Sequence, residues 1–147
     1  MSKKYMESFG LLYGVSLPEK IFKSPLPVKK ISEFVRSEDD EQIHLVVWLT
    51  KQNIPFFAIP NGGSRHKLEG YKLKRAGVQR GIPDLMLPLC CGKHHGLFIE
   101  MKRVKMSRVT DEQQFWIDLL NKNGYKAVVC YGFEDAKKIV EDYLGSM

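Results

Sequence analysis

Residues 81–102 read GIPDLMLPLCCGKHHGLFIEMK, and this stretch decides the expected fold. Two apolar segments, around residues 84–88 and 97–101, flank a turn rich in cysteine, glycine and histidine. Short apolar runs on either side of such a turn are typical of a β-hairpin. Each segment nevertheless carries an acidic residue, Asp84 and Glu100, and Lys102 follows two positions later. Three charged residues in segments that resemble interior strands need a chemical explanation.

The hairpin geometry brings these charges together. If the two strands pair symmetrically about Gly92, Asp84 lies directly opposite Glu100, with the side chains roughly 5 Å apart on one face. The period of two places Lys102 on the same face. Two carboxylates at this distance repel each other, so either one binds a proton or a cation neutralises both. Carboxylate oxygens favour Mg²⁺ or Mn²⁺. The spacing alone also allows solvated carboxylates, or a salt bridge between one of them and Lys102.

The segments around the hairpin predict an alternation of helices and strands. Ser37 is expected to cap a first helix, whose core face would carry Ile43, Val46, Val47 and Thr50. A short strand at 56–59 and a basic helix from about 65 to 76 follow. A helix at 110–123 begins with a capping-box pattern, T-D-E-Q, and its expected core stripe is Phe115, Trp116, Leu119 and Leu120.

A strand at 126–131 and an amphipathic helix at 133–144 complete the order α-β-α-β-β-α-β-α. This order predicts an α/β fold with a central mixed β-sheet flanked by helices. Residues 1–37 contain three prolines without clean periodicity, and we expect them to form an N-terminal extension to a single domain at 38–147.

Composition limits the partners and the compartment. The net charge of +6 over 147 residues favours a polyanionic partner such as nucleic acid. The absence of a long apolar run or a signal-peptide pattern predicts a cytoplasmic protein without a membrane partner. Three cysteines, an odd number, fit a reducing compartment better than a disulfide framework.

Several motifs together resemble one nuclease family. Pro83-Asp84 followed by Glu100-Met101-Lys102 is similar to the signature of the PD-(D/E)xK superfamily. Glu41-Gln42, PNGG at 60–63, Gly77 and T-x-x-Q-x-x-W at 110–116 extend the similarity to its VRR-NUC branch, over residues 38 to about 145. The chain most resembles the small stand-alone members, which are often phage-encoded.

The resemblance implies a restriction-endonuclease-like core that hydrolyses DNA phosphodiester bonds with Mg²⁺, for which Mn²⁺ would substitute. It implies that Asp84, Glu100, the Met101 carbonyl and Glu41 hold the metal, that Lys102 is the catalytic lysine, and that Gln113 lies beside the site. Read without the family, Glu41 is only a favourable acid in a first helical turn. Gln113 could simply complete the capping box with Thr110, and both roles are compatible.

Basic residues lie between the first strand and the Pro-Asp motif. Arg65, Lys74, Arg75 and Arg80 are the candidates for binding the DNA backbone, although most such charge runs are solvated helix faces. The turn residues Cys90, Cys91, His94 and His95 do not have the spacing of a zinc site, so we interpret them as a variable hairpin turn.

The sequence therefore predicts a Mg²⁺-dependent DNA endonuclease with no small-molecule cofactor. By analogy with the family, it would be a homodimer selective for branched DNA such as junctions or flaps. One alternative is a catalytically silent nucleic-acid-binding module with the same fold, and another is a nuclease that cuts plain duplex and branched DNA equally.

Overall fold

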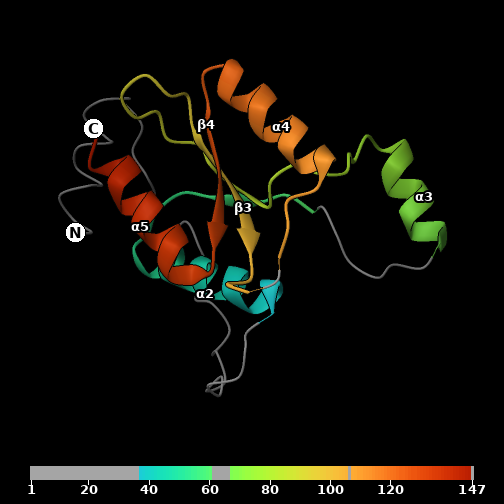
Figure 1. Cartoon of the computed structure of the whole chain (residues 1–147), viewed down its shortest axis with the longest axis horizontal. Helices are drawn as coiled ribbons and strands as arrows, with labels where there is room; N and C mark the ends of the chain where they lie inside the picture. The colour runs from blue at the N-terminus through green and yellow to red at the C-terminus, as the bar shows by residue number, and fades with distance from the viewer. Residues whose placement is uncertain (1–36, 61–66, 106, 147) are drawn as a thin grey trace.

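The computed structural model describes residues 37–60, 67–105 and 107–146, which form helices around one β-sheet (Figure 1). The element order is the predicted one, and the α/β fold class is confirmed. Within the described ranges, no helix combines the length and apolar character needed to cross a membrane. The elements are α2 (Glu38–Lys51), β1 (Phe57–Ala58), α3 (Lys67–Arg75), β2 (Leu85–Leu87), β3 (Leu97–Lys102), α4 (Asp111–Lys122), β4 (Lys126–Tyr131) and α5 (Phe133–Leu144).

The sheet has the strand order β1-β2-β3-β4 and is mixed. β1 and β2 are antiparallel, β2 and β3 form the antiparallel hairpin, and β4 pairs with β3 in parallel. In the hairpin, Leu85 faces Ile99 and Leu87 faces Leu97, which is the register predicted from symmetry about Gly92. Since Asp84 precedes β2 by one position, the same register directs it toward Glu100.

Alternation along β3 separates the hydrophobic core from the charged residues. Leu97, Ile99 and Met101 point to one face, whereas Glu100 and Lys102 point to the other. The first face meets α2 and α5, which also pack against each other. The buried core there includes Leu45, Leu49, Leu85, Leu87, Leu97, Ile99, Met101, Ala136, Val140 and Tyr143.

The predicted core face of α2 is only partly right. Ile43 is 48% exposed, whereas Leu45 and Leu49 are completely buried, together with Glu41 one turn earlier. Val46 is half-buried at the margin of the core. The helix is therefore rotated from the predicted orientation, because positions 41, 45 and 49 face inward at a spacing of four residues.

The predicted core stripe of α4 is wrong. Phe115 and Leu119 are exposed, and the buried residue is Ile117. Gln113 and Asn121, one turn on either side of Ile117, turn inward with it and form hydrogen bonds to Glu100 and to β4. Polar contacts rather than apolar periodicity thus fix the orientation of this helix.

The outer edge of β4 is covered by side chains. Asn121 accepts a hydrogen bond from the Ala127 N–H (3.0 Å) and donates one to the Ala127 carbonyl (2.9 Å). Asp135 accepts from the Tyr131 N–H (2.8 Å). These bonds satisfy backbone groups that an edge strand otherwise presents to another chain.

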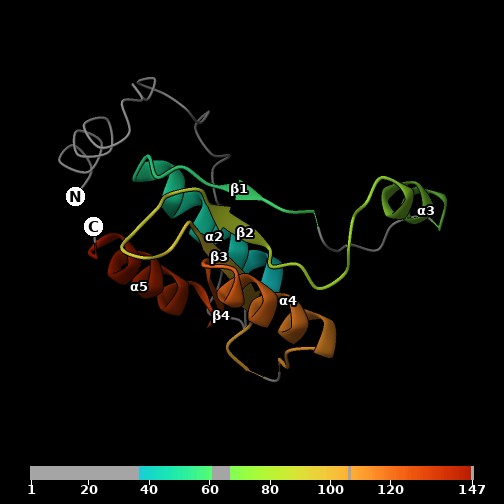
Figure 2. The ribbon, with the colours of Figure 1, turned by 90° about the horizontal axis from the view of Figure 1, so that it is seen from above.

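Helix α3 stands apart from the rest of the described structure. Both ribbon views show it beyond the end of the sheet (Figures 1 and 2), and it packs against none of the other described helices and strands. It ends where the sequence predicts, since Gly77 has a left-handed φ of 90° just after the last turn.

Candidate active site

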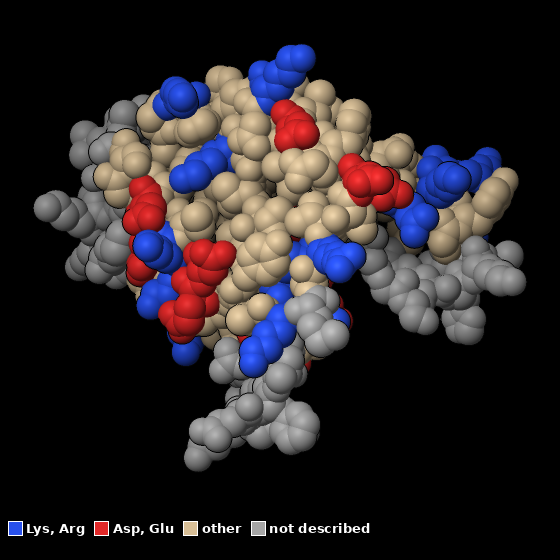
Figure 3. Space-filling model, viewed as in Figure 1, with Lys and Arg blue, Asp and Glu red and all other residues tan. Residues whose placement is uncertain are grey.

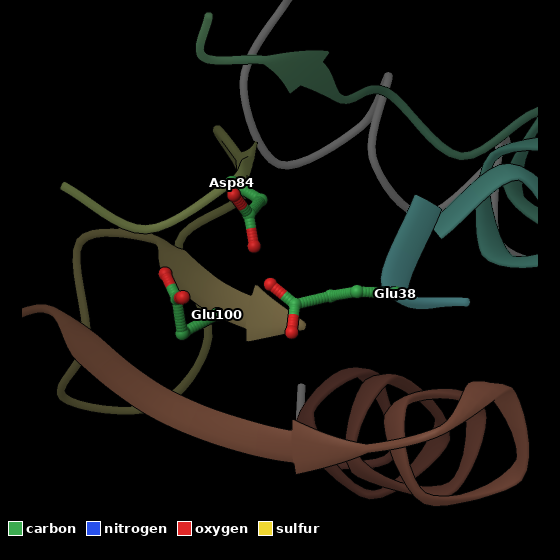
Figure 4. Close-up of side chains that lie close together, drawn as sticks. All are labelled: Glu38, Asp84 and Glu100. Atoms are coloured by element: carbon green, nitrogen blue, oxygen red, sulfur yellow. The ribbon is translucent and has the colours of Figure 1, made fainter. Parts of the chain in front are cut away.

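Three carboxylates converge at one end of the sheet, and Figure 4 shows them pointing toward one another. One oxygen each from Glu38, Asp84 and Glu100 lies within 4.8 Å of the others. Glu38 comes from the first turn of α2, Asp84 precedes β2, and Glu100 lies on β3. The structure thus brings together the two acids of the hairpin and adds a third from a helix.

Local sequence rules place each acid. Ser37 caps α2 and forms a reciprocal capping box with Asp40, so the helix begins at Glu38. The hairpin register positions Asp84 across from Glu100. Asp84 is held there because its Oδ2 accepts a hydrogen bond from the Met101 N–H (2.9 Å).

Lys102 is the cation of this cluster. Its Nζ lies 2.7 Å from Glu100 Oε1 and 3.2 Å from Glu38 Oε1. The lysine side chain is only 5% exposed, and that of Glu100 only 2%. The salt bridge to Lys102, which the sequence allowed as an alternative to a carboxylate cluster, is therefore present together with the cluster.

Further donors fix the carboxylates. The side-chain amide of Gln113 donates to Glu100 Oε1, while the Gln113 carbonyl oxygen accepts from the Thr110 N–H (2.9 Å). Gln113 therefore completes the capping box of α4 and also contacts the site, as the sequence allowed. The Ser107 hydroxyl lies 3.3 Å from Glu38 Oε2. Lys102 and Gln113 both use Oε1 of Glu100, so Oε2 accepts from neither.

Burial and mutual repulsion shift the ionisation of the acids. Desolvation, with the nearby charge of Asp84, raises the pKa of Glu100 to about 7. Desolvation also raises the pKa of Asp84, although the Met101 N–H bond and the charge of Lys102 partly offset it. Three carboxylates facing one ammonium leave an excess of negative charge that a further cation would neutralise.

Lys102 keeps its proton in this setting. Burial by itself lowers the pKa of Lys102, but the hydrogen bond and charge of Glu100, joined by those of Glu38, outweigh burial and raise it above the ordinary value. The side chain is therefore a donor at neutral pH.

The backbone of Met101 also faces the cluster. The Lys102 carbonyl accepts from the Gly132 N–H on the β4 side (2.8 Å). Successive residues of a strand direct their backbone groups to opposite edges, so those of Met101 are directed to the β2 side. The hydrogen bond from the Met101 N–H to Asp84 agrees with this direction. Strand β2 begins only at Leu85, so no residue of β2 lies opposite Met101 to pair with its carbonyl.

The acids open onto a cleft of about 530 Å³. Among the described residues of its wall, Arg80 is the basic one, whereas Asp39 and Glu112 add negative charge. The other lining residues come from α2, β1 and the segments before β2 and α4: Glu38, Gln42, Ala58, Ile59, Pro60, Gly81, Ile82, Asp84, Glu100, Thr110 and Gln113.

The Arg80-Gly81 segment is fastened to α4. The Trp116 indole N–H donates to the Arg80 carbonyl (3.0 Å). Gly81 has a φ of 83°, and an added Cβ would lie 2.6 Å from the Glu112 backbone, so only glycine fits there. Trp116 is thus not the fully buried core residue that the sequence predicted. Its indole N–H instead holds the Arg80 backbone in the wall of the cleft.

Comparison with known proteins agrees with this geometry. Residues 30–134 match the VRR-NUC domain. The chain belongs to the VRR-NUC family. A solved structure described as a VRR_NUC domain protein is similar to it with a TM-score of 0.64 and 28% identity, covering 76% of this chain and 91% of that one. No curated protein matches the chain. The family is of nuclease type, and the sheet and helices fit its restriction-endonuclease-like fold.

Glu41, predicted as a VRR-NUC metal ligand, lies outside the carboxylate cluster. Its Oε2 accepts from the Phe133 N–H (2.7 Å) at the start of α5, where Gly132 provides no side-chain cap. Glu38, which the sequence did not single out, is the third acid of the cluster. The two residues are three positions apart on one helix, and only Glu41 was matched to the family pattern in the sequence.

The remaining predicted site residues are distributed unevenly. Arg80 lies in the cleft wall, and Lys74 and Arg75 lie on α3, away from the carboxylates. Arg65 lies outside the described residues. The cysteines and histidines of the hairpin turn form no metal-binding group among the described residues.

Proposed function

We propose that this VRR-NUC domain is a divalent-metal-dependent endonuclease that hydrolyses DNA phosphodiester bonds. The observation that carries the proposal is the convergence of Glu38, Asp84 and Glu100 at one cleft, with the Lys102 ammonium paired to Glu38 and Glu100. A cleft with this excess of negative charge repels phosphate unless a cation is added.

The donor set fits Mg²⁺. Carboxylate and carbonyl oxygens are the ligands this ion prefers, and the proposed ligands are Glu38, Asp84, Glu100 and the Met101 carbonyl. Mn²⁺ accepts the same donors. When bound, the ion would act as a Lewis acid that neutralises phosphate charge and increases the acidity of water.

The chain's own residues hold and polarise this site. Lys102 is a protonated donor, so its proposed role is to orient the attacking water and to stabilise negative charge on the scissile phosphate, rather than to remove a proton. Gln113 keeps Glu100 in place and ties it to the start of α4. Asp84 is fixed by the Met101 N–H, which limits rearrangement during the reaction.

Basic residues of the segment that precedes Asp84 would hold the DNA backbone beside the acids. Arg80 lies in the cleft wall itself and is the proposed nearest phosphate contact. Lys74 and Arg75, on the protruding α3, would contact phosphates farther along the strand, and Arg65 is proposed with them.

The finer proposals rest on similarity to the family. We propose selectivity for branched DNA, and a homodimer whose two sites cut two strands symmetrically. We also propose residues 38–147 as the nuclease domain, since all described elements lie within it, and residues 1–37 as an extension.

One assay tests the activity. Purified protein is incubated with flap, four-way junction, single-stranded and duplex DNA, with Mg²⁺, Mn²⁺ or EDTA, beside the Asp84→Asn variant. We expect metal-dependent cleavage of branched DNA by the natural chain and none by the variant. Binding of all four substrates without cleavage would favour the silent binding module, and equal cleavage of duplex and branched DNA would favour a nuclease that ignores structure.

A further inference from the structure

Helix α3 lies in a segment of the chain that begins and ends at the wall of the cleft. Pro60, before this segment, and Arg80, after it, both line the cleft wall. Between them α3 extends beyond the end of the sheet without packing on another described element (Figure 2). A DNA strand that leaves the cleft past Pro60 and Arg80 would therefore pass toward α3.

The described side chains of α3 gather basic residues and one tyrosine on a single face. At 100° per residue, Tyr71, Lys72, Lys74 and Arg75 fall within about 160° of the helix circumference. All four are exposed, whereas Leu73, on the opposite side, is half-buried. Figure 3 shows basic side chains gathered over this part of the molecule.

Tyr71 is the unusual member of this face. It is 64% exposed, more than any other large hydrophobic residue among those described. The Arg75 guanidinium lies 5.9 Å from the centre of its ring, so the pair presents a flat aromatic surface beside a fixed positive charge.

This combination distinguishes unpaired nucleotides from plain duplex. Lysine and arginine suffice to bind phosphates, which every DNA presents. An aromatic ring instead stacks on the face of a base, and in a duplex those faces are already covered by neighbouring base pairs. A tyrosine surrounded by basic residues matches a single strand, whose phosphates and bases are both accessible.

We propose that α3 is a binding site for single-stranded DNA, in which Tyr71 stacks on an unpaired base while Arg75, Lys72 and Lys74 contact the adjacent phosphates. This inference rests on the proposed DNA nuclease and deepens it, because it assigns to α3 the recognition of the unpaired segment next to a branch point.

The test measures binding without cleavage. Fluorescence anisotropy in EDTA compares a short single-stranded oligonucleotide with an abasic oligonucleotide of the same length and with a duplex. We expect Tyr71→Leu to weaken binding of the base-containing single strand about tenfold and to leave the abasic strand and the duplex nearly unchanged. Leucine favours a helix at least as well as tyrosine, and the abasic strand controls for any change in α3 that does not involve stacking.

Two further variants complete the test. Tyr71→Phe keeps the ring and is expected to bind as the natural chain does, whereas Phe115→Ala removes a ring of similar exposure (60%) from α4 and is expected to have no effect. Equal binding of the base-containing strand by Tyr71→Leu and the natural chain, or an equal loss on the abasic strand, would overturn the inference. Neither result bears on the proposed nuclease activity, which stands if the protein still cleaves DNA. If instead Tyr71→Leu gives the expected loss of binding but the natural chain cleaves no DNA, only the nuclease proposal is removed.

Discussion

Exchanging Glu38 and Glu41 separately for alanine should give opposite results. Glu41 is 6% exposed and accepts a 2.7 Å hydrogen bond from the Phe133 N–H, which joins α2 to the start of α5. Hydrogen bonds to charged groups contribute roughly 1.5–3 kcal/mol, so Glu41→Ala should lower the free energy of unfolding by about 2 kcal/mol. Glu41→Gln keeps an acceptor oxygen and should lose less.

Glu38→Ala should instead spare stability and remove metal binding. The Glu38 side chain is 42% exposed, and its negative charge raises the pKa of both Asp84 and Glu100. Its removal relieves that repulsion while costing Lys102 one partner, so the free energy of unfolding should change by less than about 1 kcal/mol. Metal affinity and cleavage should both fall, the latter at least about 100-fold.

Urea unfolding followed by tryptophan fluorescence, with titration calorimetry of Mg²⁺, separates the two effects. A loss of 2 kcal/mol moves the urea midpoint by about 1 M for a protein of this size. If Glu41→Ala kept its midpoint but lost Mg²⁺ binding while Glu38→Ala still cleaved DNA, the roles assigned to these residues would be reversed.

Three other predictions follow from the same contacts. Desolvation and the charge of Asp84 raise the folded pKa of Glu100 from 4.5 to about 7, so the stability that depends on this residue is complete below pH 4.5 and is lost as pH rises through 7. Unfolding free energies measured without metal should show this decline, and saturating Mg²⁺ should reverse it. Lys102→Ala should lower cleavage at least about 100-fold while DNA affinity, measured by anisotropy, stays nearly constant; a loss of affinity alone would contradict its catalytic role. Asn121→Ala should lower the free energy of unfolding by about 1–3 kcal/mol, because it leaves the Ala127 backbone without its partner. Light scattering should then detect association of the protein through the exposed edge of β4. Unchanged stability would refute this account of the edge.

The hairpin could be predicted because its information is local. Alternation of period two, a turn and the symmetry about Gly92 fixed the register, and the register fixed that Asp84 meets Glu100. Lys102 followed from the same period. These three residues required no knowledge of how distant elements pack.

The helices were harder because their orientation depends on polar contacts made across the fold. An apolar stripe predicts that Phe115 and Leu119 face the core, but Gln113 is drawn inward by Glu100 and Asn121 by the edge of β4. Helix α4 then exposes Phe115 and Leu119 and buries Ile117. A spacing rule that counts only hydrophobic residues cannot anticipate this rotation.

The sequence did not single out Glu38, the third carboxylate of the cluster, for a related reason. Glu38 and Glu41 share one helix, and a one-turn difference decides which reaches the sheet end and which reaches α5. The capping box at Ser37 shows where the helix begins, but it places four acidic residues in the first turn and does not separate Glu38 from Glu41.

The contacts of Arg80 and Gly81 with α4 separate two parts of the chain, the acids at the end of the sheet and the segment that carries α3. Trp116 and the close approach of Gly81 to Glu112 anchor the chain immediately before Asp84. Changes of length or composition in the segment that carries α3 are therefore absorbed before they reach the acids. An exchange of α3 for another surface is therefore expected to change how the protein meets its substrate and to leave Asp84 in place.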